Sequence, residues 1–409
     1  MSERYLALEE ELDPEEYLFC EYTVKSELDI KTAGKRIAEE ESVGTWTQPI
    51  TLTEDIFEKY GAKVTYAKDN RVKIGYPVVD FSGEFGGIPQ ILSIVAGNLF
   101  GLDSLEGVRL VDIEVPKKIL NRYPGPCFGI KGLRKILERP EKPLIGTIVK
   151  PKIGLPPDDF SDYVYEAGSG GLTNSKDDET LVDQDFCTLE DRVSSVSEKL
   201  DLLEEEGHKM IHAHNITTST DEILDAADIA MENGARQLMI DVLTVGFSGL
   251  KILAKDPSID VPIHVHRAMH AALTKNPSHG ISMSVIAKLA RMAGGDALHI
   301  GTYGAGKMHA EIDEELRSKK ALTGDMHDLK RVMPVSSGGL HPGLIPELTE
   351  KSGMDVQIQA GGGVSGHPDG VKAGAKALKQ AVDACFKDLN IREYAQEHVE
   401  LKRALEKWM

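Results

Sequence analysis

The run Lys176-Asp177-Asp178-Glu179 carries the side-chain types of a divalent metal site. Asp178 and Glu179 offer carboxylates, the hard oxygen ligands that Mg²⁺ prefers. On an extended chain Lys176 and Asp178 point to the same side, whereas Asp177 points the other way and is expected to be structural. An ammonium would repel a metal, but a lysine carbamate formed with CO2 would supply a third anionic oxygen. The alternative is a solvated charge cluster at the end of a strand.

Two glycine runs are candidates for binding phosphate. Gly338-Gly339 and Gly361-Gly362-Gly363 expose backbone N–H groups that can cradle an anion, although tight turns would use the same residues. Arg267, His299 and Ser337 suggest a second anion site, because arginine contacts phosphate in a bidentate way. Separate hydrogen bonds are the alternative for these three. Two phosphate sites at one place would imply a bisphosphate substrate.

Three lysines have spacing or surroundings that suit catalysis. Lys150 and Lys152 lie on one side of an extended Lys-Pro-Lys, where two ammonium groups lower each other's pKa and prepare one for proton transfer. Lys307 follows Gly304-Ala305-Gly306, a loop that could close over a ligand. Each could instead be an ordinary solvated lysine.

These side chains follow short apolar segments that alternate with helical patterns. The eight expected strands are 143–149, 171–175, 209–213, 237–241, 261–265, 297–301, 332–336 and 355–359. Helical patterns lie between many of them, at 187–206, 219–234, 281–294 and 369–387. Eight such units in about 250 residues predict an α/β fold, a closed (β/α)8 TIM barrel whose strand ends meet at one mouth. An open doubly wound sheet is the alternative.

The remaining segments are expected to be less involved in chemistry. A smaller N-terminal α+β (ferredoxin-like) domain should occupy 1–125, and the barrel with its C-terminal helical tail should occupy 126–409. Turn residues at 123–126 motivate that boundary. The charged segment 312–320 is expected to be a solvated helical face, and 386–408 a terminal helix without evident chemistry.

Composition excludes several classes of protein. Lys and Arg number 47 against 66 Asp and Glu, a net charge of −19, which argues against a nucleic-acid partner but leaves room for a local basic pocket. No apolar run is long enough for a membrane span, and the first residues lack a secretory pattern. Four cysteines, far apart and without a CxxC pair, favour a reduced, cytoplasmic chain.

Several motifs occur in an order that carries a resemblance to a known family. In the barrel they are Lys150-Pro151-Lys152-Ile153-Gly154, Gly170-Gly171-Leu172, Lys176-Asp177-Asp178-Glu179, the run 264–270 (HVHRAMH), Ser337-Gly338-Gly339, Gly361-Gly362-Gly363 and Gly366-His367-Pro368. In the first domain they are Glu40, Gly44-Thr45-Trp46-Thr47 and Gly97-Asn98. Together they resemble the large subunit of ribulose-1,5-bisphosphate carboxylase/oxygenase (RuBisCO), and the short chain is most similar to its archaeal, form III-like members.

The resemblance implies Mg²⁺-dependent carboxylation, and oxygenation, of ribulose 1,5-bisphosphate to two molecules of 3-phosphoglycerate. Lys176, carbamylated by activator CO2, would bind Mg²⁺ with Asp178 and Glu179 and take the C3 proton to give an enediol. Lys307 would orient CO2, and Lys150 would be the proton donor. The resemblance further implies that Lys152 tunes Lys150 and that His266 assists proton transfer.

The resemblance also implies how substrate and subunits are held. Arg267, His299 and Ser337 would hold one phosphate. The residues implied for the other phosphate are Thr45, Trp46, Lys307, Gly338, Gly339, Gly361 and Gly362. Glu40, Thr45, Trp46 and Asn98 would complete the barrel site of a neighbouring subunit, Glu40 and Asn98 as part of its catalytic set. A homodimer would then be the minimal unit, rings of dimers are possible, and no small subunit is required.

Two other interpretations stay open. The strand residues Thr173-Asn174-Ser175, a loop before Lys307 that is one residue longer than in plant-type chains, and His309 depart from the family pattern. They would suit a RuBisCO-like protein that enolises or isomerises a related sugar phosphate without fixing CO2. A non-catalytic subunit that uses only the scaffold is the third interpretation.

Overall fold

The computed structural model describes residues 2–45, 47, 49–83, 85–307 and 311–409. The chain divides into two compact units: Met1–Tyr123 with Met269–Met292, and Pro124–Ala268 with Ala293–Met409. Within the described ranges, no helix is long and apolar enough to cross a membrane. The boundary expected at residue 125 stays a prediction about how the chain is organised into domains.

The first unit is built on a five-stranded sheet in the order β10-β4-β1-β3-β2. Its strands are β1 (Tyr17–Lys25), β2 (Lys63–Lys68), β3 (Arg71–Pro77), β4 (Gly107–Glu114) and β10 (Gly280–Ile281). Residues 269–292 join this unit because β10 pairs in parallel with β4. The other pairings are antiparallel, which confirms the expected α+β class.

Helices complete the first unit. They are α1 (Ile30–Glu40), α2 (Glu54–Tyr60), α3 (Ile88–Val95), α4 (Lys117–Leu120), α11 (Ala271–Thr274) and, up to Met292, α12 (Met283–Ala293). Short 3-10 turns are η1 (Ser2–Tyr5), η2 (Val78–Phe81) and η3 (Leu99–Gly101). Asp29 caps α1 by accepting from the Thr32 N–H at 3.1 Å. A Cβ at Gly34 would lie 3.0 Å from Val72, so glycine lets α1 approach the sheet closely.

The second unit is a closed barrel of eight parallel strands in the order β11-β12-β13-β5-β6-β7-β8-β9. They are β5 (Leu144–Ile148), β6 (Asn174–Lys176), β7 (Ile211–Asn215), β8 (Gln237–Asp241), β9 (Ile263–His266), β11 (Ala297–His299), β12 (Met333–Ser337) and β13 (Gln357–Gln359). Pairing of β13 with β5 closes the ring. The expected TIM barrel is therefore confirmed, and the open sheet is excluded.

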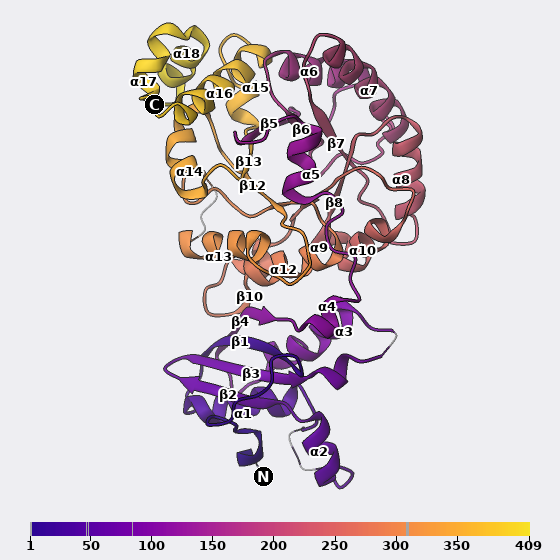
Figure 1. The fold of residues 1–409 in the computed structure, drawn as a ribbon, viewed down its shortest axis with the longest axis vertical. Coiled ribbons are helices and arrows are strands. Elements are labelled where there is room, and N and C mark those ends of the chain that lie inside the picture. Colours follow the sequence, from indigo (N-terminus) through magenta and orange to yellow (C-terminus); the bar gives the residue numbers. More distant parts are fainter. Residues whose placement is uncertain (1, 46, 48, 84, 308–310) are drawn as a thin grey trace. The chain divides into compact units, whose positions relative to one another are not determined.

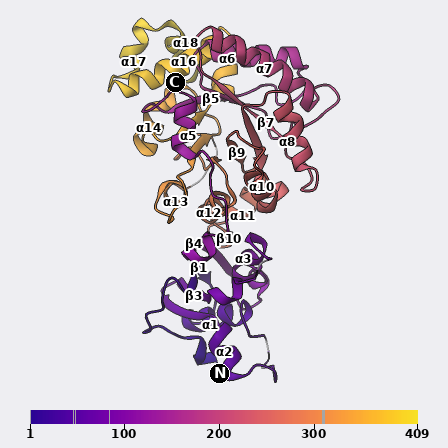
Figure 2. The same ribbon diagram turned by 45° about the vertical axis from the view of Figure 1, so that its right-hand side comes forward.

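The helices of this unit lie around the strands, with α5 across one end of the barrel (Figures 1 and 2). They are α5 (Gly129–Ile136), α6 (Pro157–Ser169), α7 (Leu189–Glu205), α8 (Ile223–Glu232), α9 (Val242–Val245), α10 (Phe247–Lys255), α13 (Ile312–Thr323), α14 (Ile345–Ser352), α15 (Gly362–Ser365), α16 (Val371–Phe386), α17 (Ile391–Tyr394) and α18 (Val399–Trp408). The 3-10 turns η4 (Pro342–Leu344) and η5 (Ala395–Glu397) lie among the last of them.

A hydrophobic cluster closes the amino-terminal end of the barrel. Ile130, Leu133 and Leu137, from α5 and the residue after it, pack there against strand residues. Their partners are the first residues of four strands, Leu144, Ile211, Ala297 and Met333, together with Val335. Burying a side chain such as Leu133 contributes about 1.5–3 kcal/mol. Because this end is filled with apolar side chains, polar chemistry is confined to the opposite, carboxyl-terminal end.

One strand expectation needs correction. The strand expected over 171–175 begins only at Asn174, because Gly171 has φ +96° and its N–H donates to the Gly168 carbonyl at 2.8 Å, which ends α6 in a turn.

Candidate active site

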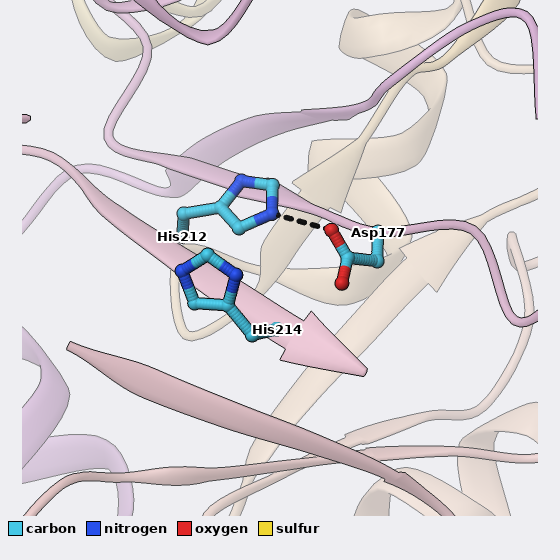
Figure 3. Close-up of side chains that lie close together, drawn as sticks. All are labelled: Asp177, His212 and His214. Atoms are coloured by element: carbon cyan, nitrogen blue, oxygen red, sulfur yellow. Dashed lines mark hydrogen bonds and ion pairs between the residues drawn. The ribbon is translucent and has the colours of Figure 1, made fainter. Parts of the chain in front are cut away.

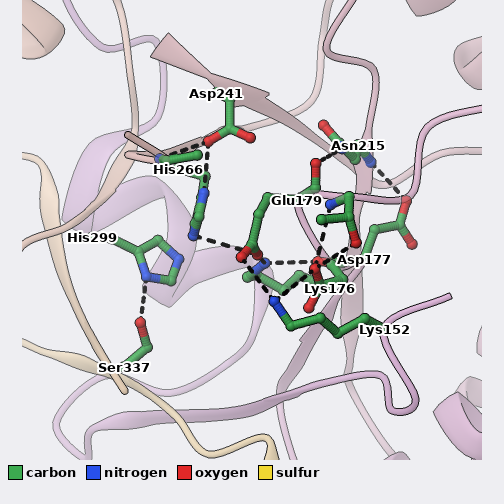
Figure 4. A network of polar contacts seen from close by, with 12 residues as sticks. Lys152, Lys176, Asp177, Glu179, Asn215, Asp241, His266, His299 and Ser337 are labelled. Carbon is green, nitrogen blue, oxygen red and sulfur yellow. Dashed lines mark hydrogen bonds and ion pairs between the residues drawn. The ribbon is translucent and has the colours of Figure 1, made fainter. Parts of the chain in front are cut away.

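The carboxyl end of β6 is Lys176, and Asp178 and Glu179 follow it closely in the sequence. Figure 4 shows Lys176 and Glu179 close together at the barrel mouth. Lys176 is fully buried, and its Nζ donates to the Asp177 carbonyl at 2.7 Å and lies 3.8 Å from Glu179 Oε2. Burial lowers the pKa of Lys176 despite the surrounding carboxylates. An uncharged lysine amine is the form that reacts with CO2, so this environment suits carbamate formation.

Two lysines from the segment after β5 neutralise the carboxylates. Lys150 Nζ donates to Asp178 Oδ2 at 2.7 Å. Burial alone would raise the pKa of Asp178, but the hydrogen bond and charge of Lys150 outweigh it and lower that pKa. Lys152 Nζ lies 3.7 Å from Asp178 Oδ1 and 3.6 Å from Glu179 Oε1. The two carboxylates thus converge on a point that already accommodates a cationic group, and the donor set fits Mg²⁺.

Asp177 points away from this point, as the alternation along an extended chain predicts. Its carboxylate accepts from Arg192 Nε at 3.1 Å, from the Asn215 N–H at 2.7 Å and shares a 2.8 Å hydrogen bond with His212 Nε2. Ser175 Oγ shares a 2.6 Å hydrogen bond with the other nitrogen of His212. All of these side chains are buried. The departure at Ser175 therefore belongs to a buried hydrogen-bonded network that supports Lys176 and Asp178.

A second group of potential metal ligands lies in this support. Donor atoms of Asp177, His212 and His214 lie within 4.8 Å of one another (Figure 3). By distance they could hold an ion, but Arg192 already balances the Asp177 charge. Burial would raise the pKa of Asp177, yet Arg192 and His212 reverse that effect and lower it. Burial also lowers the pKa of His214 well below its usual value, which keeps that ring neutral.

Histidines from β9 and β11 form the other side of the mouth. His266 Nδ1 lies 2.6 Å from Asp241 Oδ1, and its Nε2 lies 3.7 Å from Glu179 Oε2. His299 Nδ1 shares a 2.7 Å hydrogen bond with Ser337 Oγ, and its Nε2 lies 2.7 Å from His264 Nε2. Burial lowers the pKa of both His264 and His299 well below the usual value. His264 and His299 therefore present neutral rings, and His299 holds Ser337 at this side of the mouth.

The glycine turns bring backbone close to two of the candidate lysines. A Cβ at Gly361 would lie 3.2 Å from Lys150 Cε, and a Cβ at Gly339 would lie 2.9 Å from Lys307 Cβ. Gly339 has φ +79°, and the Lys307 N–H donates to the Gly338 carbonyl at 3.0 Å. Gly362 opens α15 with no atom within 4 Å of an added Cβ, which leaves room beside its backbone.

The last helix packs behind the second glycine turn, although we expected no role for it. Trp408 stacks on His341 with ring centroids 5.6 Å apart, and Lys407 Nζ donates to the Gly366 carbonyl at 2.5 Å. His367 Nε2 donates to the Glu400 carbonyl at 2.9 Å. The segment 386–408 thus supports the turn that contains Gly361 and Gly362.

In the first unit, Asn98 Nδ2 lies 3.5 Å from Glu40 Oε1, and the two side chains line one cavity of about 390 Å³. Glu41 orders this region by accepting from the Gly97 N–H at 3.0 Å and the Leu99 N–H at 2.7 Å. Thr45 is half-buried. Trp46 and His309 lie outside the described residues.

Sequence reasoning gave no role to four residues of the barrel site: Asp241, His264, Arg192 and Asn215. His264 opens the run 264–270, and Asn215 lies at a strand end that carries polar residues. The strand pattern could have identified two of them. Asp241 is the last residue of the expected strand 237–241, and His264 lies within the expected strand 261–265. Arg192 lies inside a helical pattern and Asn215 just beyond an expected strand. The pairing of β7 with β6 and the packing of α7 on the barrel bring those two to Asp177.

Comparison with known proteins places the chain in a family. The family model described as ribulose bisphosphate carboxylase large chain, catalytic domain, matches residues 129–408, and the model of its N-terminal domain matches 6–119. A protein of Methanocaldococcus jannaschii named ribulose bisphosphate carboxylase is 42% identical to this chain, and the match covers 93% of this chain and 94% of that protein. A protein of Pyrococcus furiosus with the same name is also 42% identical, and the match covers 92% of this chain and 90% of that protein.

Solved structures agree with this assignment. Octameric Rubisco from Pyrococcus horikoshii OT3, in complex with sulfate, has a TM-score of 0.93 and 38% identity and covers 99% of this chain and 96% of that one. Dimeric archaeal Rubisco from Hyperthermus butylicus has a TM-score of 0.90 and 38% identity and covers 100% and 99%. The chain belongs to the family of ribulose bisphosphate carboxylase large chains.

Proposed function

We propose that the chain catalyses the Mg²⁺-dependent carboxylation of ribulose 1,5-bisphosphate to two molecules of 3-phosphoglycerate, with oxygenation as a competing reaction. The observation that carries this proposal is the convergence of Asp178 and Glu179 beside buried Lys176 at the barrel mouth. Family membership and the names of the relatives support the substrate.

Activation begins at Lys176. Its neutral amine attacks the carbon of CO2, an N–C bond forms, and a proton leaves the nitrogen. The resulting carbamate, with Asp178 and Glu179, would hold Mg²⁺. When bound, Mg²⁺ stabilises the negative charge that develops on the substrate oxygens.

Side chains at the barrel mouth then carry out the proton transfers. The Lys176 carbamate takes the C3 proton to give the enediol, and CO2 adds at C2 with Lys307 orienting it. His266, oriented by Asp241, lies within 3.7 Å of Glu179 and can relay protons near the reacting carbons. Water then adds at C3, the C2–C3 bond breaks, and Lys150 donates the final proton to C2 of the fragment that carries the new carboxylate. Lys152 lies beside Lys150, with its Nζ 3.7 Å from Asp178 and 3.6 Å from Glu179.

Two anion sites across the mouth would hold the phosphates. Arg267, His299 and Ser337 would bind one of them. The other would be bound by backbone and side chains of Lys307, Gly338, Gly339, Gly361 and Gly362, with Thr45 and Trp46 from a second subunit. Glu40 and Asn98 would reach the same neighbouring site.

A homodimer would be the minimal unit in this proposal, without a small subunit and with rings of dimers possible. The dimeric and octameric states named for the structural relatives support it. A cytoplasmic location belongs to the same proposal.

Purified protein incubated with Mg²⁺, labelled CO2 and ribulose 1,5-bisphosphate tests the reaction. The wild-type chain should yield labelled 3-phosphoglycerate. Lys176→Met should lower the rate by about 100-fold or more, because it removes the general base. The control Lys209→Met changes an exposed lysine paired with Glu204 and should leave the rate unchanged. Absence of labelled product from the wild type would refute the proposal, and proton exchange on another phosphorylated ketose without carboxylation would favour the RuBisCO-like alternative.

A further inference from the structure

Glu315 is a buried carboxylate on a helix that the sequence marks as solvated. It lies in the first turn of α13 and is 2% exposed. Its Oε1 accepts from the Thr302 N–H at 3.0 Å, and its Oε2 accepts from the Gly304 N–H at 3.1 Å. A glutamate is seldom buried unless it is paired. Both carboxylate oxygens of Glu315 are used to hold the backbone of the segment that leads to Lys307.

Further contacts make Thr302–Lys307 a defined structure. The Gly306 N–H donates to Thr302 Oγ1 at 3.0 Å, and Lys351 Nζ donates to the Tyr303 carbonyl at 3.2 Å. The Lys307 N–H is fixed on the Gly338 carbonyl at 3.0 Å. A Cβ at Gly301, where φ is +131°, would lie 1.8 Å from Glu315 Oε1, so the carboxylate approaches the start of this segment as closely as backbone allows.

Glu315 also acts on Arg267 through its charge. Burial lowers the pKa of Arg267 to about 10, and the negative charges of Glu315 and Glu314 oppose that effect. In return, burial raises the pKa of Glu315, while the hydrogen bond from Thr302 and the charge of Arg267 lower it. The charge of Glu315 therefore favours the charged form of an arginine proposed to bind phosphate, while its oxygens hold the backbone that leads to Lys307.

We propose that Glu315 is a positioning residue that holds the backbone of the segment Thr302–Lys307, and so sets where the Lys307 ammonium meets CO2. This inference rests on the proposed carboxylase function. Enolisation depends on Lys176 at β6, whereas carboxylation also needs Lys307. Loss of Glu315 should therefore slow carboxylation while enolisation continues at nearly its normal rate.

The test compares Glu315→Gln with the control Asp313→Asn. Glutamine keeps the length of the side chain but replaces one acceptor oxygen with an NH2 group, which cannot accept from a backbone N–H. Asp313 is exposed on the first turn of the same helix, and its change alters net charge by the same amount. Two rates are measured in the full-length Mg²⁺-loaded enzyme: exchange of the C3 proton of ribulose 1,5-bisphosphate with solvent, and incorporation of labelled CO2.

Glu315→Gln should keep the exchange rate within about twofold and lower carboxylation by about 30-fold, which corresponds to about 2 kcal/mol at 1.36 kcal/mol per tenfold. Asp313→Asn should leave both rates unchanged. Equal losses of exchange and carboxylation, or unchanged carboxylation, would overturn the role of Glu315. If Glu315→Gln does not fold, Thr302→Val decides, because it removes the acceptor of the Gly306 N–H and should give the same separation. A wild-type chain inactive in both assays would instead overturn the proposed function.

Discussion

Asp177→Asn tests whether the buried support beneath the metal ligands is what holds them in place. Asp177 balances Arg192, whose side chain is fully buried, and it also bonds His212 and the Asn215 N–H. Asparagine has the same shape but no charge, and its NH2 group faces a donor. The substitution thus leaves the Arg192 charge buried and uncompensated.

The expected loss of stability follows from that burial. Removing one partner of a buried ion pair costs about 3–5 kcal/mol. The matched control is Asp201→Asn, because Asp201 pairs with Arg236 at the surface and its side chain is 66% exposed. Exposed pairs contribute about 0.2–1 kcal/mol. Arg236 retains its ion pair with Glu204, 3.0 Å away, when Asp201 is replaced. The loss of stability in the control should therefore lie at the lower end of that range.

Thermal unfolding measures the difference. At about 2 °C per kcal/mol for a domain of this size, Asp177→Asn should lower Tm by about 6–10 °C and Asp201→Asn by less than about 2 °C. Acidification provides an independent check. Because the Asp177 pKa is lowered in the folded state, its contribution is present above the unfolded pKa of about 3.9 and is lost as pH falls through the folded pKa. The gap between wild type and Asp177→Asn should therefore be constant at neutral pH and narrow in acid.

The reasoning would be refuted if the two variants unfolded within about 2 °C of each other, since a buried pair would then be worth no more than an exposed one. A gap that widened in acid would contradict the sign of the Asp177 contribution.

Three further predictions concern binding and catalysis. Ser337→Ala removes the hydroxyl that shares a 2.7 Å hydrogen bond with His299. Steady-state kinetics should show the KM for the bisphosphate raised about tenfold, because one hydrogen bond to a charged phosphate is lost. An unchanged KM would show that Ser337 does not bind the phosphate. Trp408→Ala takes away the ring stacked on His341 behind the Gly361 turn and should raise the same KM while calorimetric Mg²⁺ affinity stays constant; a loss of Mg²⁺ affinity would point to general unfolding. Removal of divalent metal with a chelator should abolish both C3-proton exchange and carboxylation, and added Mg²⁺ should restore them; exchange that survives chelation would contradict the proposed metal role.

The sequence predicts the barrel and most of its mouth because strand ends in a TIM barrel converge by rule. The separation of Asp177 from Asp178 follows from alternation alone. The strand predicted over 171–175 begins only at Asn174 in the structure. The left-handed turn at Gly171 is a local backbone feature that an apolar pattern does not reveal. The prediction that segment 312–320 is a solvated helical face is wrong at Glu315. That side chain is buried against the loop whose backbone it binds.

Other parts of the site depend on contacts that no local pattern contains. Arg192 is fifteen residues from Asp177 along the chain, and Asp241 is twenty-five from His266. Each is an ordinary polar residue in its own segment. Only the register of neighbouring strands and the packing of α7 on the barrel bring these groups together.

In the proposed mechanism, Lys176 is the residue modified by CO2, and Asp178 and Glu179 complete a Mg²⁺ site with it. A crystal structure determined with Mg²⁺ and bicarbonate tests this most directly. We expect density for a carbamate on Lys176 Nζ and an ion about 2.1 Å from oxygens of that carbamate, Asp178 and Glu179. An unmodified Lys176 that still donates to the Asp177 carbonyl, with the ion held instead by Asp177, His212 and His214, would contradict the account.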